Sequence, residues 1–403
     1  MKLLPIIITT LMLLLLISCE QNKKENIFVD FKNSLGNMVS TVPEMPLTKK
    51  FSQSINIEKK LLCQYKIVPK KVVNLFPNNK VLIGKIGRIK LHGNRIYLHD
   101  TQTHALHIST KEGKWINTIR RVGKGEGEYF GITDFTIDKK NNILIIADVK
   151  LKKLIYFEMD GKYIKEIHFP FWFREFSSLP SGDLCFLTLG KNYTGYKILI
   201  CGKNGKIKRK AIPIPIDEVY RLNMYSRIGS YVKQNENNLS ITTPFTDDIY
   251  TITNDTISQI FKLNLGKNKL PFYNTKHLDI GSFNKLINES EQEALFYLGG
   301  FLETKKNVLL GLFKSRSAYN IIYRKSQMDL AQLNMNLYGK AQLSFPVFVE
   351  NENFISIADA CWISDHKKEL KNIPEFEKVL DQLTPASNPV LVTFNISESH
   401  DKK

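Results

Sequence analysis

Two segments of the chain repeat the same pattern of side chains 48 residues apart. The first is Asn94–Ile119, NRIYLHDTQTHALHISTKEGKWINTI, and the second is Asn141–Ile167, NNILIIADVKLKKLIYFEMDGKYIKEI. A fixed period of this size indicates one supersecondary unit that recurs along the chain and buries its apolar face against its neighbours. The matching pairs are Ile96 and Leu144, Asp100 and Asp148, Leu106 and Leu154, Gly113 and Gly161, Trp115 and Tyr163, and Ile119 and Ile167.

Each repeat predicts three strands, with an aspartate in the first turn and a glycine in the second. This is the pattern of a small antiparallel sheet. Weaker copies of the pattern occur near Leu184, Leu239, Val308 and Phe354, which brings the number of units to six. The spacing of about 40–50 residues is typical of propeller blades. We therefore predict an all-β fold, a six-bladed β-propeller of four-stranded antiparallel blades.

The ends of the chain are expected to close the ring. The last strand, NPVLVTFNI at Asn388–Ile396, has apolar residues at alternate positions. An unpaired edge strand invites aggregation, so this strand should pair with one from the other end of the chain. Its predicted partner is the region around 61–68. The propeller is assigned to residues 51–397 and a tail to 398–403.

A glycine-rich stretch, RVGKGEGEYFGITDFTIDKKNNILIIAD at Arg121–Asp148, could be mistaken for a phosphate-binding loop. Such a loop needs a helix directly after it, because the helix N-terminus faces the phosphate. Here the glycines are followed by apolar residues at every second position, which predicts strands. Glu126 and Glu128 would also repel a phosphate. We interpret the glycines as turns that carry the chain from one blade to the next.

These residues resemble a known family. The segments GKGEGEYFGITDFTID and LIYFEMDGKYIKEI are similar to the linker and blade of NHL-type propellers. Over about residues 55–397 the chain resembles the six-bladed, NHL/TolB-like β-propeller lipoproteins of Bacteroidetes, including TPFTDDIYTI, LGKNKLPF and SNPVLVTFNI. The resemblance implies a fold and supplies no catalytic motif.

The N-terminus predicts export. An apolar run at Leu3–Ile17 is shorter than the ~20 residues that a spanning helix needs, and it fits the core of a signal peptide. The run ends in LISC, which resembles a bacterial lipobox with Cys19 as the acylated first residue of the mature protein. We assign 1–18 to the signal peptide and 19–50 to a lipidated N-terminus and tether. The alternative is an ordinary secretory signal in which the cysteine is incidental.

The chain is basic, with 57 Lys and Arg against 39 Asp and Glu and a formal net charge of +18. Such a balance can favour acidic partners through long-range fields. Export argues against nucleic acid, however, and the lysines are scattered singly between the predicted strands. We interpret them as solvated residues that protect strand edges from aggregation.

The sequence contains no catalytic or metal-binding motif that we recognise, and we expect no metal and no cofactor. His99, His104 and His107 lie close to Asp100 and could be imagined as metal ligands. Asp100 already has a structural role, because it corresponds to Asp148 and is expected to hydrogen-bond the backbone of its own turn.

Two cysteines are candidates for a disulfide. If DLCFLTLGKNYTGYKILICG forms a hairpin whose loop is centred on Tyr193, Cys185 and Cys201 lie directly opposite each other. An exported protein permits this bond. The alternative is that both remain reduced and act as small core residues.

Two regions are candidates for a ligand-binding face. One lies beside a predicted crossing between blades, and the other is the aromatic stretch HFPFWFREF at His168–Phe176. Phe169, Phe171 and Phe173 share one side of that stretch and can equally be core residues. The candidate residues are Arg120, Arg121, Tyr129, Asp134, Trp172 and Arg174.

These observations give three hypotheses for function. The leading one is a lipoprotein, held in a cell-envelope membrane through Cys19, whose propeller binds an envelope protein or a glycan without catalysis. The outer membrane is the expected location, with the leaflet left open, and the propeller is expected to be monomeric. The alternatives are an enzyme of lyase or lactonase type with a site in the central channel, and a purely structural envelope component. Ionisable residues that converge on the channel would speak against the structural role.

Overall fold

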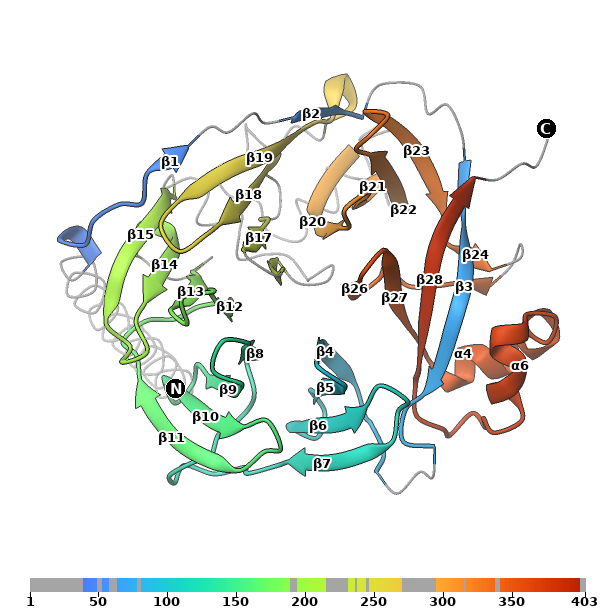
Figure 1. Ribbon diagram of the computed structural model, residues 1–403, viewed down its shortest axis with the longest axis horizontal. Coiled ribbons are helices and arrows are strands. Elements are labelled where there is room, and N and C mark those ends of the chain that lie inside the picture. Colours follow the sequence, from blue (N-terminus) through green and yellow to red (C-terminus); the bar gives the residue numbers. More distant parts are fainter. Residues whose placement is uncertain are drawn as a thin grey trace, which may run out of the picture.

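The protein is all-β, and its sheets stand radially around a common centre (Figure 1). This arrangement is that of a β-propeller. The computed structural model describes residues 39–48, 53–57, 64–77, 81–188, 194–214, 231–235, 238–243, 246–269, 295–314, 317–337 and 341–398.

Four sheets each contain an antiparallel meander of four consecutive strands. The first two consist of β4 (Ile86–His92), β5 (Arg95–Asp100), β6 (Ala105–Thr110) and β7 (Trp115–Ile119), and of β8 (Asp134–Asp138), β9 (Ile143–Asp148), β10 (Lys153–Glu158) and β11 (Tyr163–His168). The next two consist of β12 (Glu175–Ser178), β13 (Leu184–Leu187), β14 (Tyr196–Cys201) and β15 (Ile207–Pro213), and of β16 (Val232–Gln234), β17 (Leu239–Ile241), β18 (Asp248–Ile252) and β19 (Ile257–Asn264).

An eight-stranded sheet occupies the remaining sector, in the order β20-β21-β22-β23-β3-β28-β27-β26. Its strands are β20 (Leu295–Glu303), β21 (Asn307–Lys314), β22 (Ser317–Arg324), β23 (Asp329–Asn334), β3 (Gln64–Asn74), β28 (Val390–Glu398), β27 (Asn353–Ala358) and β26 (Phe348–Glu350). A short 3-10 helix, η1 (Gly266–Asn268), follows β19, and a two-stranded sheet pairs β24 (Asn336–Leu337) with β25 (Ala341–Gln342).

The hydrophobic core is divided into clusters that lie between neighbouring sheets. One cluster joins residues of β5 and β6 to residues of β8, β9 and β10, and another joins β9 and β10 to β13 and β14. The second strands of the sheets are therefore buried on both faces, as in the run Ile143–Asp148, where all residues after the first are buried. A strand buried on both faces reads as a continuous apolar run, which explains the sequence ILIIA.

The repeat predicted from the sequence is confirmed in the first two sheets, including its turn aspartates. Asp100 ends β5, and its carboxylate accepts hydrogen bonds from the backbone N–H groups of Lys85 (3.0 Å) and Gln102 (2.9 Å). Asp148 ends β9 and does the same with Leu151 (3.0 Å) and with the segment that precedes β8. In each sheet, one buried carboxylate joins the turn after the second strand to the segment that enters the first.

The glycine-rich stretch connects the outer strand β7 to the inner strand β8, and no helix follows it, as predicted. The loop is held by side chains of its own sheet. The ammonium of the buried Lys153 donates to the carbonyl of Gly125 (2.9 Å) and pairs with Glu166 (3.0 Å), and Glu166 also accepts the N–H of Gly127 (3.0 Å). Gly127 has a φ of +67°, a conformation that favours glycine.

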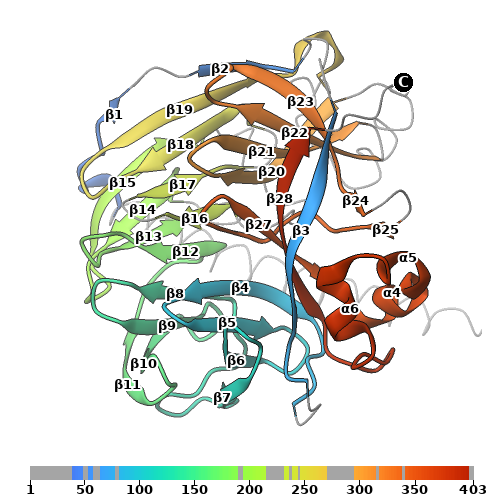
Figure 2. The ribbon, with the colours of Figure 1, turned by 45° about the vertical axis from the view of Figure 1, so that its right-hand side comes forward.

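The predicted pairing of the two ends of the chain is present. β28 runs antiparallel to β3, with Ile396 opposite Ile67 and Val390 opposite Asn74. The two strands lie side by side in both views (Figure 2). β3 extends further along the chain than the predicted region around 61–68, and its other edge pairs parallel with β23.

Part of the stretch assigned to the tether packs against the propeller. β1 (Leu47–Thr48) lies within that stretch and pairs parallel with the outer strand β19, as does β2 (Gln53–Asn56) just after it. Upstream, the side chain of Val39 is buried, and the ammonium of Lys210 donates to the carbonyl of Val39 (3.0 Å) and to that of the next residue (3.1 Å). The predicted signal peptide and Cys19 lie outside the described residues.

Three helices between β27 and β28 were not predicted. They are α4 (Ala360–Asp365), α5 (Lys367–Leu370) and α6 (Pro374–Leu380), and they pack beside β3 (Figure 2). Pro374 occupies the first turn of α6, where its missing N–H is tolerated. In the part of the chain that the structure describes, no helix is long and apolar enough to cross a membrane.

The predicted contact between Cys185 and Cys201 is wrong by one residue. Cys185 lies opposite Ile200, and Cys201 lies opposite Leu184. Because side chains alternate between the faces of a strand, this shift places the two sulfurs on opposite faces of the sheet. Each joins a different hydrophobic cluster, and both are free, buried thiols.

Candidate functional site

The inner strands of four sheets present charged side chains to the centre of the propeller. Arg88 and Lys90 belong to β4, Asp134 begins β8, Glu175 begins β12 and Lys233 lies in the middle of β16. Strand residues alternate between faces, so the residues between the polar ones pack into the core clusters. The alternation places charge at the centre without interrupting the core.

Arg88 is held between two carboxylates from different sheets. Its Nε lies 2.8 Å from Asp134 Oδ1, and its Nη2 lies 3.1 Å from Glu175 Oε1. All three side chains are almost fully buried, with exposed fractions of 9%, 1% and 0%. Glu175 also accepts the backbone N–H groups of Tyr231 (2.8 Å) and Val232 (3.0 Å) at the start of β16. This ion-pair network links the inner strands of four consecutive sheets.

The electrostatics of the network follow from burial and charge pairing. Burial acts to lower the pKa of Arg88, but the charges of Asp134 and Glu175 outweigh it and raise the pKa above its ordinary value. Burial raises the pKa of Asp134, and the positive charges of Arg88 and Lys90 oppose that rise. The guanidinium of Arg88 is therefore permanently charged, and its positive charge favours the ionised forms of Asp134 and Glu175.

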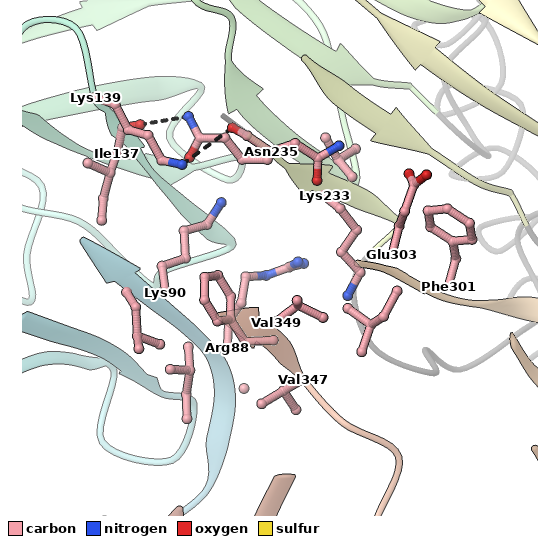
Figure 3. A pocket seen from close by; sticks show the side chains of 17 residues that line it. Arg88, Lys90, Ile137, Lys139, Lys233, Asn235, Phe301, Glu303, Val347 and Val349 are labelled. Atoms are coloured by element: carbon pink, nitrogen blue, oxygen red, sulfur yellow. Dashed lines mark hydrogen bonds between the residues drawn. The ribbon is translucent and has the colours of Figure 1, made fainter. Parts of the chain in front are cut away.

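A cavity of about 110 Å³ lies beside this network, and it collects residues from β4, β16, β20 and β26. In Figure 3 the side chains of Arg88, Lys90 and Lys233 point towards one common space. The lining also includes apolar side chains, among them Val347 and Val349.

Lys90 and Lys233 are half-buried cations with no carboxylate partner among the described residues. The ammonium of Lys90 lies 3.5 Å from Thr136 Oγ1. Burial lowers the pKa of Lys90 to about 8, against the raising effect of Asp134. Burial also lowers the pKa of Lys233 to about 7, and the charges of Arg88 and Lys90 add to that effect. An anion bound near these lysines would raise their pKa values and favour the protonated forms.

Of the residues that we predicted for a ligand-binding face, only Asp134 belongs to this centre. Tyr129 is fully buried, and its hydroxyl donates to the carbonyls of His104 (2.8 Å) and Ile119 (3.0 Å). Its position in a binding face was wrong, because the ring serves as a core residue under the glycine-rich stretch. Arg120 is exposed, and its Nε donates to the backbone of the β5–β6 turn at 3.2 Å.

The other candidates lie apart from the cavity lining. Arg121 is exposed, and its guanidinium lies 5.6 Å from the ring centre of Tyr163. Trp172 is 46% exposed between β11 and β12, whereas the phenylalanines on either side of it are buried core residues, as the alternative interpretation held. The guanidinium of Arg174 lies 5.0 Å from the ring centre of Tyr231.

Of the histidines near Asp100, His107 has a structural contact. His107 is buried, its Nδ1 lies 2.9 Å from Thr118 Oγ1, and burial lowers its pKa. The carboxylate of Asp100 is occupied by backbone N–H groups, which confirms its predicted role in the turn. In the described ranges, no three His, Cys, Asp or Glu side chains are grouped as a metal site would require.

Sequence reasoning missed Arg88, Lys90 and Lys233. The available signal was a charged residue inside a short strand that enters a blade: IGRIKLH contains the first two and YVKQ the third. β8 and β12 also contain a charged residue at their first position, Asp134 and Glu175. Only the radial arrangement of the sheets brings these strands together.

Comparison with known proteins places the chain in a family. It belongs to the family described as a domain of unknown function (DUF4934), whose model matches residues 69–395. No curated protein matches the sequence.

The structural comparisons concern the fold. The protein is similar to an exported protein from Bacteroides fragilis, with a TM-score of 0.70 and 16% sequence identity, over 86% of this chain and 100% of that one. It is also similar to a member of the DUF4221 family from Bacteroides vulgatus, with a TM-score of 0.49 and 10% identity, over 83% and 99% of the two chains. At 16% identity the first of these similarities supports the β-propeller fold.

Proposed function

We propose that this protein is an exported lipoprotein, anchored at Cys19 in the outer membrane, whose monomeric propeller binds an envelope protein or a glycan without catalysis. The propeller has six blades in this proposal. The eight-stranded sheet then comprises two blades, β20 to β23 and β26-β27-β28-β3, which meet at the parallel pair β23–β3. The N-terminal strand β3 would close the ring by completing the last blade.

The cavity at the centre is the observation that carries the binding function. Cations from two different sheets face it, and Lys90 and Lys233 have no carboxylate partner in the described part of the chain. A purely structural component gains nothing from unpaired cations that are partly removed from water, because their desolvation opposes folding. Such groups are typical of a site that awaits a ligand.

Filling the cavity tests this function. Val349→Trp should place an indole in the lined space, and binding of the native ligand from envelope extract should be lost. The readout is the thermal unfolding temperature, since a ligand at 100 times its Kd adds ~2.7 kcal/mol to stability. Val122→Trp, at a position 51% exposed on the linker after β7, is the matched control. Equal binding by both variants would refute a site in the cavity.

Membrane attachment through Cys19 is a separate prediction. The Cys19→Ala variant should move from the membrane fraction to the aqueous phase when its producing cells are broken. One acyl chain gives only marginal binding, so stable anchoring at Cys19 requires a second chain or another membrane signal. Metabolic labelling with a fatty acid should mark the wild type and leave the variant unlabelled. Retention of Cys19→Ala in the membrane would contradict the lipid anchor.

An enzyme with a channel site is the alternative function, and one observation favours it. A lysine with a pKa of about 7, such as Lys233, is partly neutral at physiological pH and could accept a proton from a bound substrate. Chemical conversion of a bound ligand by the wild type, and not by Lys233→Met, would favour the enzyme over the binding module.

A further inference from the structure

Among the described residues at the centre of the propeller, cationic groups outnumber carboxylates by one. Arg88, Lys90 and Lys233 supply three cationic groups, and Asp134 and Glu175 supply two carboxylates. Both carboxylates bind Arg88, and both also accept backbone N–H groups. They are therefore committed to the network, and the surplus lies with the two lysines.

The lysines approach one space from two strands that are not neighbours. Lys90 extends from β4 and Lys233 from β16, and the strands β8 and β12 stand between these two in the chain order. Their side chains point into the same cavity (Figure 3). At its mouth, Lys139 is exposed, and Glu303 is already paired with Lys325 at 2.6 Å. Both side chains line the cavity, so an anionic group bound there would be attracted to both ammonium groups.

The lining of the cavity also includes apolar side chains. Its half-buried apolar side chains include Val349 from β26 and Val347 just before β26, whereas Phe301 of β20 is 1% exposed and packs into a core cluster. Apolar side chains next to cations suit a ligand that carries its charge on a hydrocarbon skeleton, because such a ligand buries apolar area while its charge is paired.

We infer that the cavity binds a carboxylate attached to an apolar group, with the carboxylate between Lys90 and Lys233 and the apolar group against Val347 and Val349. This inference rests on the binding function proposed above and names the chemical class of the ligand. A monoanion matches the surplus of one positive charge. A phosphate dianion would leave an unpaired negative charge in a partly buried site, which is unfavourable.

The volume limits how much of the ligand enters. A cavity of about 110 Å³ is smaller than the ~300–1,000 Å³ of sites that enclose drug-sized molecules. It accommodates a short organic acid, or only the terminal residue of a longer chain. Two kinds of ligand therefore carry the required carboxylate and apolar group: a free aliphatic acid, and the C-terminal residue of an envelope protein.

Binding of a carboxylate should change the protonation of Lys90 and Lys233. In the part of the chain that the structure describes, the charged groups that face the two lysines are Arg88 from β4, Asp134 from β8, Glu175 from β12, Lys139 beside β8 and Glu303 from β20. Burial lowers the pKa of Lys90 to about 8 and that of Lys233 to about 7, so both are partly deprotonated at pH 8. A bound carboxylate favours the charged lysines, and binding at pH 8 should therefore take up protons.

The test is isothermal titration of the mature chain carrying Cys19→Ala. The probes are hexanoate, a short peptide that ends in leucine with a free carboxylate, the same peptide with an amidated end, glucuronate and inorganic phosphate. We expect hexanoate or the free-carboxylate peptide to bind, and the amidated peptide to bind at least about tenfold more weakly. Hexanoate alone would indicate a free acid, and the peptide alone would indicate a protein terminus.

Variants connect the binding to the lysines. Lys90→Met and Lys233→Met should each weaken carboxylate binding about tenfold or more, because each removes a charge-assisted hydrogen bond. Lys162→Met, at a side chain 73% exposed on the outer turn between β10 and β11, makes the same change of charge and should leave the affinity unaltered. Titration at pH 8 in HEPES and in Tris measures the proton uptake, which Lys233→Met should reduce.

The outcomes separate this inference from the proposed function. Binding of glucuronate or phosphate in preference to the apolar carboxylates would overturn the ligand class and leave the binding function intact. Failure of every carboxylate probe would also overturn it, whereas the Val349→Trp experiment with envelope extract judges the binding function independently. Carboxylate binding that both lysine variants retain would place the ligand elsewhere and refute the site.

Discussion

Arg88→Met is expected to destabilise the protein by about 3–5 kcal/mol, the range measured when one partner of a buried ion pair is removed. Among the described residues, Arg88 is the one cation whose side chain pairs with both Asp134 and Glu175, and its loss leaves two buried carboxylates near each other. Methionine keeps much of the side-chain volume, so lost packing contributes little. Urea unfolding followed by tryptophan fluorescence measures the change.

The pH dependence of Arg88→Met has a defined sign. Burial already raises the pKa of Asp134, and removal of the guanidinium should raise it further. When a carboxyl has a higher pKa in the folded protein than in the unfolded chain, the protein loses stability as the pH rises through the folded pKa. The defect should therefore be smaller at pH 5 than at pH 8.

A triple variant is the control for this prediction. Arg88→Met combined with Asp134→Asn and Glu175→Gln removes all three charges and keeps the side-chain shapes. Glu175→Gln can keep both backbone hydrogen bonds on its one oxygen, whereas Asp134→Asn keeps one of two. Replacing a complete buried ionic group is often neutral, whereas breaking it is strongly unfavourable. The triple variant should recover most of the lost stability. If it is as unstable as the single variant, charge pairing does not explain the effect.

The fold could be predicted because its signals are local. Asp100 and Asp148 each bind the backbone of their own sheet, and the glycines after each third strand permit the turns that the repeat requires. Such residues recur wherever the unit recurs, so the sequence displays them with a constant spacing. The strand pairing of the chain ends followed from the need to cover an edge.

The errors in the sequence analysis arose where the outcome depends on single residues. The pairing of Cys185 with Cys201 assumed the centre of a loop, and an error of one residue in that centre moves a side chain to the other face of the sheet. The helices between β27 and β28 were missed, although Leu370, Ile373 and Phe376 have a helical spacing of apolar residues and pack into one cluster.

The candidate site could not be predicted, for a different reason. Arg88, Asp134, Glu175 and Lys233 are distributed over 146 residues of sequence and belong to four sheets. No local pattern links them, because each is simply a charged residue in a short strand. Their meeting point is fixed by the radial packing of the sheets, and a sequence alone does not contain those distances.

Lys90→Met and Lys233→Met are each expected to stabilise the ligand-free protein while they weaken binding. The folded state lowers the pKa of Lys90 to about 8 and of Lys233 to about 7, against about 10.4 in an unfolded chain. Each pKa unit corresponds to about 1.4 kcal/mol, and with a discount for partial exposure we expect a gain of about 1–3 kcal/mol per variant at pH 6.

The pH dependence distinguishes this effect from a change in packing. Below pH 7 both lysines are charged in the folded and unfolded states, and the full cost of burying the charge is present. Between pH 7 and pH 10 the unfolded chain binds more protons, so the wild type gains stability as the pH rises and the advantage of the variants should shrink. Urea unfolding at pH 6 and pH 9, with Lys162→Met as the control, measures both quantities. A variant that is less stable than the wild type at pH 6 would show that its lysine supports the fold, and the argument for an unoccupied anion site would fail with it.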